Sequence, residues 1–366
     1  MKAVKVAKFA YESSSDVHSL LTIFARMCND AIRIALENHS KSRFDLIEVA
    51  YKELKNYGLH THYILSACEI AFSLCRNRNP ISIPYIRKPF LKLDKQSFNL
   101  DYLILRIPVR PREFIYITLE GSSYHRSFLS DPTLKTGSVT ITESAVIVSF
   151  SKDAKETKPI GYIGLDVNEK NVTAATGNCY VRRFDELSEV AEIKERYKEI
   201  RAEIGRATRG DRRISKRLYA KYGKREKNRT IQRINKISGE VVNFARENRL
   251  GIKMERLDGI RKLYRKGNGQ TRLFRGRMNS WSFHEVQRQI EYKARWDGIP
   301  VYYVNPRGTS RNCPDCGSRV APLQERKLYC SECDKTWDRD VLAARNIAAA
   351  AVPAARPPRG SCEEES

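Results

Sequence analysis

Four of the nine cysteines have the spacing of metal ligands. They form two Cys-x-x-Cys pairs, Cys313 with Cys316 and Cys330 with Cys333, separated by thirteen residues. This spacing lets four thiolates surround one tetrahedral Zn²⁺ at about 2.3 Å. A site of four thiolates has no open position, so the sequence predicts one structural zinc ion in a ribbon. An iron–sulfur or redox site is the alternative, and the strand-like residues 327–330 between the pairs favour zinc.

The other five cysteines are scattered along the chain: Cys28, Cys68, Cys75, Cys179 and Cys362. They show no disulfide framework, the total count is odd, and the first residues lack the apolar core of a secretory signal. We therefore expect a reducing compartment and a cytoplasmic protein. No apolar run approaches the roughly 18 residues that span a bilayer.

Three acids lie where a metal-dependent nuclease needs them. Asp166 ends a hydrophobic strand, Glu255 ends a second strand, and Asp340 opens a helix after the paired cysteines. The ends of neighbouring parallel strands and the start of a helix can converge at one edge of a sheet. Carboxylates there can hold two Mg²⁺ ions about 4 Å apart, with Mn²⁺ as a substitute. One ion would activate the attacking water, and the other would stabilise the leaving 3′-oxygen.

Each acid alone has a simpler explanation. An aspartate after a strand is often a turn residue or a helix cap, and Asp338 competes with Asp340 at the start of the last helix. The prediction of a metal site therefore rests on the three acids together and on their order around the cysteine pairs.

The elements that would position these acids follow from the apolar patterns. Residues 160–184 predict three short strands, the first of which ends at Asp166. The later patterns predict a long basic helical stretch over 188–248, a strand over 249–257, a basic loop over 260–277, an amphipathic helix over 281–297, a strand from 301 and a helix from about 340.

The first 150 residues predict a different arrangement. Alternating residues 2–10 predict a strand, and apolar spacing near 3.6 predicts a helix over 16–38 with Asp16 as its N-cap. Residues 43–78 are helical in pattern, and residues 100–150 are rich in β-formers. A helical insert flanked by strands therefore precedes the segment that carries the acids.

The charge of the chain indicates a polyanionic partner. There are 67 Lys and Arg against 43 Asp and Glu, a formal net charge of +24. Nucleic acid fits better than a membrane surface, because no basic amphipathic segment with exposed aromatics is evident. A merely basic protein without such a partner is the alternative.

Two segments concentrate the positive charge. Residues 201–236 hold fourteen Lys and Arg against three acids, and residues 260–277 hold seven with none. A solvated helix face is the alternative, but this imbalance is too large for pairing within a helix. The candidate nucleic-acid contacts are Arg212, Arg213, Lys216, Arg217, Lys221, Lys224, Arg225, Arg261, Lys262, Arg265, Lys266 and Arg272.

The acids, the cysteine pairs and their flanking residues resemble the TnpB (OrfB) proteins of insertion sequences and the related compact type V CRISPR effectors. The resemblance covers residues 160–350. The matching segments are Gly164–Asn168, Ile252–Leu257, Thr309–Ser310, Cys313–Gly317, Cys330–Cys333, Asp338–Asp340 and Ala343–Ile347.

The resemblance implies an α/β RNase H-like (RuvC) nuclease domain with an inserted zinc ribbon, and an N-terminal β-barrel-like wedge with a helical insert. The expected boundaries are 1–12 and 98–158 for the wedge, 13–97 for the insert, 159–308 and 335–352 for the nuclease domain, 309–334 for the ribbon and 353–366 for a disordered tail.

The resemblance also implies an activity and partners. Asp166, Glu255 and Asp340 match the family's catalytic acids, and the second aspartate of the Asp-Arg-Asp motif is favoured over Asp338. A structured guide RNA from the protein's own transposable element would direct cleavage of double-stranded DNA beside a short motif. Such a protein would be prokaryotic and would associate with the nucleoid when bound to DNA.

Two departures from the family pattern stand beside this match. Leu342 replaces a common asparagine, which predicts a weaker hydrogen bond at the helix start, and Arg311 replaces a common glutamine. Three alternatives stay open: a catalytically weak or inactive RNA-guided repressor, a transposase-type recombination protein, and a zinc-ribbon module that binds nucleic acid without chemistry.

Overall fold

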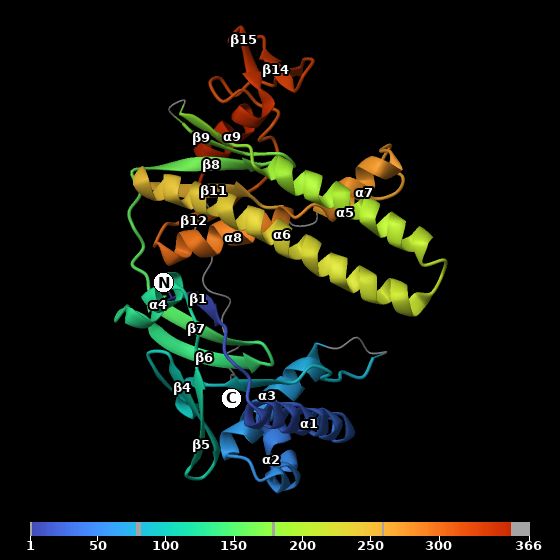
Figure 1. Ribbon diagram of the computed structural model, residues 1–366. Coiled ribbons are helices and arrows are strands. Elements are labelled where there is room, and N and C mark those ends of the chain that lie inside the picture. The colour runs from blue at the N-terminus through green and yellow to red at the C-terminus, as the bar shows by residue number, and fades with distance from the viewer. Residues whose placement is uncertain (1, 78–81, 178–179, 258–259, 353–366) are drawn as a thin grey trace. The chain divides into compact units, whose positions relative to one another are not determined.

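The computed structural model describes residues 2–77, 82–177, 180–257 and 260–352 (Figure 1). The chain divides into two compact units, residues 2–153 and the part that begins at Ala154. The expected disordered tail, residues 353–366, lies outside the described residues. No helix within the described residues is long and apolar enough to cross a membrane.

Three α-helices follow the first strand of the first unit before its next strand. These are α1 (Ser15–Glu37), α2 (Arg43–Leu54) and α3 (Thr61–Arg76). The N-cap of α1 is Ser14, whose hydroxyl accepts a bond from the backbone of Val17 at 3.3 Å. The prediction that Asp16 caps this helix was wrong, because Asp16 lies inside the first turn, where its charge suits the helix dipole. The break between α2 and α3 falls at Gly58, which has φ +67°.

The strands of the first unit form two antiparallel sheets. One has the order β1-β7-β6-β2, and the other has the order β3-β4-β5. Their bounds are β1 (Lys2–Phe9), β2 (Phe90–Leu93), β3 (Asn99–Asp101), β4 (Ile104–Arg110), β5 (Glu113–Thr118), β6 (Lys135–Thr142) and β7 (Ala145–Asp153). A short helix, α4 (Ser123–Ser130), lies within the predicted β-rich region, and its run of Ser and aromatic residues gave no helical signal.

The second unit is built on a five-stranded sheet of order β10-β9-β8-β11-β12. Strands β10, β9 and β8 pair antiparallel, whereas β11 is parallel to both β8 and β12. The bounds are β8 (Gly161–Val167), β9 (Val172–Thr176), β10 (Val181–Phe184), β11 (Leu250–Glu255) and β12 (Val301–Val304). The predicted strands ending at Asp166 and near Glu255 are confirmed within one residue.

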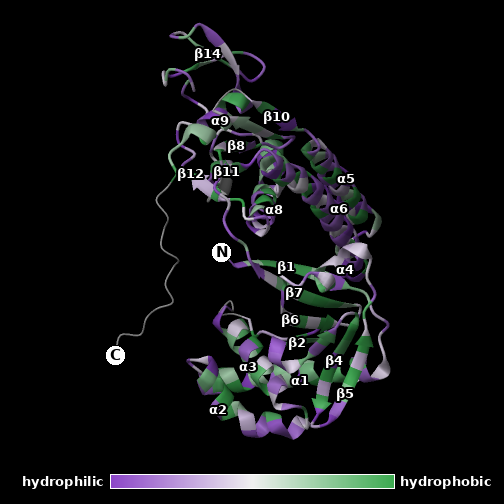
Figure 2. Cartoon of the chain, turned by 90° about the vertical axis from the view of Figure 1, so that its left-hand side faces the viewer, coloured by the Kyte–Doolittle hydropathy of each residue, from purple (hydrophilic) through white to green (hydrophobic). Residues whose placement is uncertain are grey.

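Helices cover both faces of this sheet. Three of them, α5 (Leu187–Ala207), α6 (Arg212–Glu247) and α8 (Phe283–Trp296), share one hydrophobic core with the sheet. The predicted basic helical stretch is therefore two helices, which lie side by side in Figure 1 and whose hydrophilic residues appear in purple in Figure 2. The last helix, α9 (Arg339–Ala349), packs on β8, β9 and β11.

The segment predicted as a basic loop is partly helical. It contains a short 3-10 helix, η3 (Ile260–Tyr264), and the helix α7 (Arg272–Ser280). Thr271 caps α7 by accepting a bond from Phe274 N at 3.3 Å. The prediction of a loop was wrong here, because the glycines that suggested it lie before the helix or are tolerated inside it at Gly276.

The alternation of side chains along β8 and β11 separates the core from the acids. Ile163, Leu165 and Val167 face the shared core, as do Ile252 and Met254. The residues between them therefore face α9, and this places both strand acids on the α9 side of the sheet.

Gly164 lets α9 approach that face closely. A Cβ at this position would lie 2.0 Å from the carbonyl oxygen of Ala344 and 2.4 Å from the backbone nitrogen of Ala348. Both atoms are helix backbone and cannot rotate away. The distance between α9 and β8 therefore depends on the missing side chain.

We expect Gly164→Ala to lower the stability of the second unit by about 1–3 kcal/mol, because the helix must move away from the sheet. Gly223→Ala is the matched control: Gly223 lies inside α6 with no atom within 4 Å of an added Cβ, and alanine there should stabilise by about 0.5–1 kcal/mol. Denaturation followed by tryptophan fluorescence measures this unit, since all three tryptophans belong to it. Equal midpoints for Gly164→Ala and the wild type would contradict the close approach.

Candidate functional site

The parallel pairing of β8 and β11 brings Asp166 and Glu255 side by side. Met254 pairs with Leu165, and one step further in the same register Glu255 stands beside Asp166. Because residues in register on parallel strands point to the same face, both carboxylates lie on the side covered by α9. Two acids separated by 89 residues in sequence thus become neighbours at the ends of adjacent strands.

The start of α9 brings the third acid to the same place. Asp338 is the N-cap: its Oδ1 accepts bonds from Asp340 N at 3.0 Å and Val341 N at 3.2 Å, and it pairs with Arg183 at 2.6 Å. Asp340 is the second residue of the helix and only 7% exposed. The structure therefore separates the two competing aspartates: Asp338 caps the helix, and Asp340 faces the other acids.

The electrostatics of Asp166 show that the three acids converge. Burial is the main cause that raises the pKa of Asp166 to about 7, and the negative charges of Asp340 and Glu255 contribute to the same rise. Asn168 opposes this effect by donating from Nδ2 to Asp166 Oδ2 at 2.8 Å. When no cation is bound, a carboxyl group with a pKa near 7 readily takes up a proton. The site therefore favours a bound positive charge, either a proton or a metal ion.

Glu255 lies in a similar environment. Burial raises its pKa, and a hydrogen bond donated by the Thr309 hydroxyl opposes that rise. The backbone carbonyl of Glu255 accepts a bond from Gln287 Nε2 of α8 at 2.8 Å. Both the backbone and the side chain of this acid are therefore held by neighbours.

One cation from the region of the cysteine pairs reaches the acids. Arg326 forms an ion pair with Asp340 Oδ1, and its Nη2 also lies 3.4 Å from Asn168 Oδ1. Its guanidinium offsets part of the negative charge that Asp340 contributes to the cluster.

The donor set of this cluster suits a hard divalent cation. Three carboxylates supply only oxygen ligands, which Mg²⁺ and Mn²⁺ prefer over nitrogen or sulfur. Burial first, and then the like charges of Asp340 and Glu255, raise the pKa of Asp166, and a bound metal can offset the cost of ionising this acid as a proton does. The residues present therefore fit the predicted Mg²⁺.

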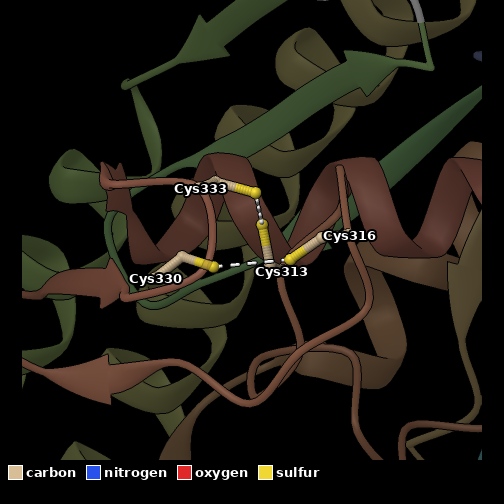
Figure 3. Close-up of side chains that lie close together, drawn as sticks. All are labelled: Cys313, Cys316, Cys330 and Cys333. Carbon is tan, nitrogen blue, oxygen red and sulfur yellow. Dashed lines mark hydrogen bonds between the residues drawn. The ribbon is translucent and has the colours of Figure 1, made fainter.

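The side chains of the four paired cysteines point toward one another beside a small three-stranded sheet (Figure 3). The strands are β13 (Ala321–Pro322), β14 (Lys327–Cys330) and β15 (Lys335–Asp338). All four sulfur atoms lie within 4.8 Å of one another, with 3.5 Å between Cys316 and Cys330 and 3.9 Å between Cys313 and Cys333. Tetrahedral Zn²⁺ with bonds of about 2.3 Å requires sulfur separations close to these.

The backbone of the first pair has the form of a metal-binding knuckle. Gly317 N donates to Cys313 O at 2.9 Å, Cys313 N donates to Ser318 O at 2.8 Å, and Gly317 has φ +79°. Hydrogen bonds from Ser318 lower the pKa of the Cys316 thiol to about 6, which favours the thiolate that a metal needs. The cluster is consistent with the predicted structural zinc ion.

The cysteine cluster and α9 share a hydrophobic core. Leu342 is fully buried and packs with Cys313, Cys330 and their apolar neighbours. The prediction that Leu342 weakens the helix start is not supported, because Asp338 supplies the bonds there. Leucine instead joins the helix that carries Asp340 to the cysteine cluster.

The candidate nucleic-acid contacts lie on α6, on η3 and the loop that follows it, and at the start of α7. All of those whose side chains the structure describes are exposed; Arg261 is outside that set. Lys221 and Arg225 both approach the ring of Tyr222, at 5.9 and 5.5 Å from its centroid. Among the described residues, none of these cations has a carboxylate within 4 Å, whereas Arg201 pairs with Glu226 and Arg233 with Glu189.

Three residues at the acid cluster have little or no signal in the sequence. Asn168 and Thr309 belong to the matching segments, but their bonds to Asp166 and Glu255 come from the fold. Arg326 had no signal at all. It lies between the cysteine pairs at φ +61°, a conformation that few residues other than Gly and Asn adopt.

Comparison with known proteins assigns the family. A family model described as Cas12f1-like, TNB domain, matches residues 283–347, which include the four cysteines and most of α9. The TnpB-like protein MJ0751 of Methanocaldococcus jannaschii is 34% identical over 250 residues, covering 66% of this chain and 89% of the relative. The chain belongs to the TnpB-like protein family. A second TnpB-like protein from the same organism, MJ1635, is 22% identical over 325 residues, which cover 82% of this chain and 71% of MJ1635.

The chain is also similar to CRISPR-associated proteins. The CRISPR-associated endodeoxyribonuclease Cas12f1 of Sulfoacidibacillus thermotolerans is 33% identical over 73 residues, 19% of this chain and 17% of that protein. The cryo-EM structure of a Cas12f1–sgRNA–target DNA complex aligns with a TM-score of 0.62 at 16% identity, over 91% of this chain and 82% of that one. The TnpB-like chain therefore has a Cas12f-like fold.

We expect Cys313→Ser to reduce zinc from one ion per chain to almost none and to unfold the cysteine cluster, because three thiolates cannot close a tetrahedral site. Elemental analysis and a thermal melt measure the two effects. Cys75→Ser in the first unit is the control and should retain zinc. A well-folded Cys313→Ser protein without zinc would contradict the structural role.

We expect the stability of the protein, in buffer free of divalent cations, to fall between about pH 4 and pH 7 through Asp166 and to level off above pH 7. Its folded-state pKa of about 7 lies above the ordinary value of 3.8 for an aspartate, so the folded protein prefers the protonated form and loses this stability as pH rises toward and through 7. Asp166→Asn should remove this slope and melt several degrees higher at pH 8.

Added Mg²⁺ should raise the melting temperature of the wild type but not of Asp166→Asn. Asp338→Asn retains a good N-cap and should respond to pH and Mg²⁺ as the wild type does. Identical pH profiles for Asp166→Asn and the wild type would overturn this account of the site.

Proposed function

We propose that this chain is an RNA-guided DNA endonuclease that cleaves DNA at a site formed by Asp166, Glu255 and Asp340. The observation that carries the proposal is the convergence of these three acids on one face of the five-stranded sheet, in a chain of the TnpB-like family. The mixed order of that sheet, β10-β9-β8-β11-β12, suits an RNase H-like (RuvC) nuclease domain. The β-sheets of the first unit would form the wedge, and α1 to α3 its recognition insert.

The three carboxylates would hold two Mg²⁺ ions, which supply an activated water and neutralise the leaving oxygen. The chain's own residues position the acids. Asn168 orients Asp166, Thr309 and Gln287 hold Glu255, and Asp338 fixes the first turn that presents Asp340. No cysteine or histidine nucleophile is required, which agrees with a cysteine cluster that has a structural role.

The exposed cations support the proposed partners. Guide RNA paired with its DNA target forms a heteroduplex that a protein holds through the phosphate backbone, while base pairing supplies the sequence specificity. Exposed arginines and lysines without carboxylate partners, such as Arg212, Arg217 and Lys224 on α6, suit that contact. The Cas12f1 structure with the same fold was solved with sgRNA and target DNA, which favours the same class of partners for this chain.

The first experiment expresses the protein together with its native flanking DNA and sequences the RNA that copurifies. We expect a discrete structured RNA whose end derives from sequence beside the gene. That RNA then serves as the guide in a cleavage assay. Only heterogeneous fragments that salt removes would reject the RNA-guided function.

The second experiment tests the acids. We expect Asp166→Ala to reduce Mg²⁺-dependent cleavage by at least about a thousandfold, because removal of a metal ligand abolishes the charge stabilisation of the transition state. RNA binding should be unchanged, since Asp166 lies away from the exposed cations of α6. Asp153→Ala, at an exposed aspartate of the first unit, is the control and should cleave normally. Retained cleavage in Asp166→Ala would exclude this site as the nuclease centre.

A further inference from the structure

The side chain of Glu255 is held by a hydroxyl group that lies 54 residues away in the sequence. The hydroxyl of Thr309 donates a hydrogen bond to Glu255 Oε1, and Thr309 itself is only 8% exposed. The same hydroxyl lies 3.0 Å from the carbonyl of Pro306. The ionised carboxylate is the stronger acceptor of the two, so the single hydroxyl proton points to Glu255.

Thr309 is in turn held by the last helix. Asn346 of α9 donates from Nδ2 to the carbonyl of Thr309 at 2.7 Å and to the carbonyl of Asn312 at 2.8 Å. A single amide group thus fixes the segment between β12 and the cysteine cluster on both sides of its turn. Asn346 lies on the same helix as Asp340, six residues further on.

These hydrogen bonds connect two of the acids. They run from Glu255 on β11 through Thr309 to Asn346 on α9, the helix that also carries Asp340. The backbone of Glu255 is fixed independently by Gln287 of α8. Thr309 therefore controls the carboxylate and not the strand.

A glutamate needs such a partner more than an aspartate does. It has one more rotatable bond, so holding its carboxylate in one place costs more conformational entropy. Asp166 has an equivalent partner in Asn168, at 2.8 Å, and Asp340 is fixed by the first turn of its helix. Because Thr309 bonds to Oε1, the other carboxylate oxygen of Glu255, Oε2, can still bind a metal ion.

We propose that Thr309, held by Asn346, is a positioning residue that orders Glu255 and directs Oε2 to the Mg²⁺ site. The proposal rests on the proposed function, because it assumes that Glu255 is a metal ligand. Hydrogen-bonded partners of metal ligands typically change metal affinity by about 10- to 100-fold when removed. Thr309 is thus expected to affect metal binding as well as cleavage.

The test measures Mn²⁺ affinity by electron paramagnetic resonance of the free ion, on full-length protein with its zinc retained and without nucleic acid. Thr309→Val keeps the shape of the side chain and removes the donor, and it should weaken Mn²⁺ binding by about tenfold or more. Thr309→Ser keeps the hydroxyl and should bind Mn²⁺ within about twofold of the wild type. Zinc content and melting temperature show whether each variant is folded.

A double-mutant cycle with Glu255→Gln separates positioning from packing. If Thr309 acts through Glu255, Thr309→Val should have little further effect once Glu255 is replaced. An equal loss of affinity in both backgrounds would mean that Thr309 supports the fold alone, and this would overturn the proposal. Wild-type affinity in Thr309→Val would overturn it as well.

A second variant covers the case in which Thr309→Val loses zinc or melts early. Asn346→Ala leaves the hydroxyl in place and loosens the segment that carries it, so Mn²⁺ affinity should fall only while Glu255 is present. An unchanged affinity there would reject the proposal. If Glu255→Gln by itself leaves Mn²⁺ affinity unchanged, the assignment of the acid site fails, and with it the proposed function.

Discussion

The burial of three carboxylates beside one another is the constraint on which the second unit depends. Burial, together with the charges of Glu255 and Asp340, raises the pKa of Asp166 to about 7, so without a cation the ionised acids favour water and separation. The fold resists that separation at the backbone level. The parallel ladder between β8 and β11 fixes two of the acids, and the close contact at Gly164 fixes the helix that carries the third.

The last helix connects this constraint to the cysteine cluster. Toward the sheet, α9 contacts Gly164, and near its C-terminal end Lys253 of β11 donates to the carbonyl of Ala348 at 2.7 Å. Toward the cluster, Leu342 is buried with the cysteines, and Arg345 pairs with Asp315 at 3.2 Å. A metal bound to the cysteines would therefore stabilise the acid site through the helix, although the two sites share no ligand.

The sequence predicts those parts of the site that local patterns determine. The cysteine spacing and the strand ends at Asp166 and Glu255 are local, and so is the helix after Asp340. Contacts between distant segments leave no such pattern. Arg326 meets Asp340 only because the β13–β14 turn folds back, and Thr309 meets Glu255 across 54 residues. The sequence predicts a loop at α7 for a related reason: the segment has a glycine and few apolar residues, and the ion pair of Arg277 with Glu169, 108 positions away, leaves no local pattern.

The whole chain is positively charged, whereas the acid cluster is negatively charged. The two regions therefore interact differently with a nucleic acid. Exposed cations on α6 attract a polyanion over distances of about 10 Å. The acid cluster by itself repels a phosphate group, and Arg326 offsets only part of that charge. A phosphodiester can therefore approach the three carboxylates only when divalent cations lie between them. Under the proposed function, the basic surface brings the nucleic acid to the protein, and the metal requirement determines where along the bound strand cleavage can take place.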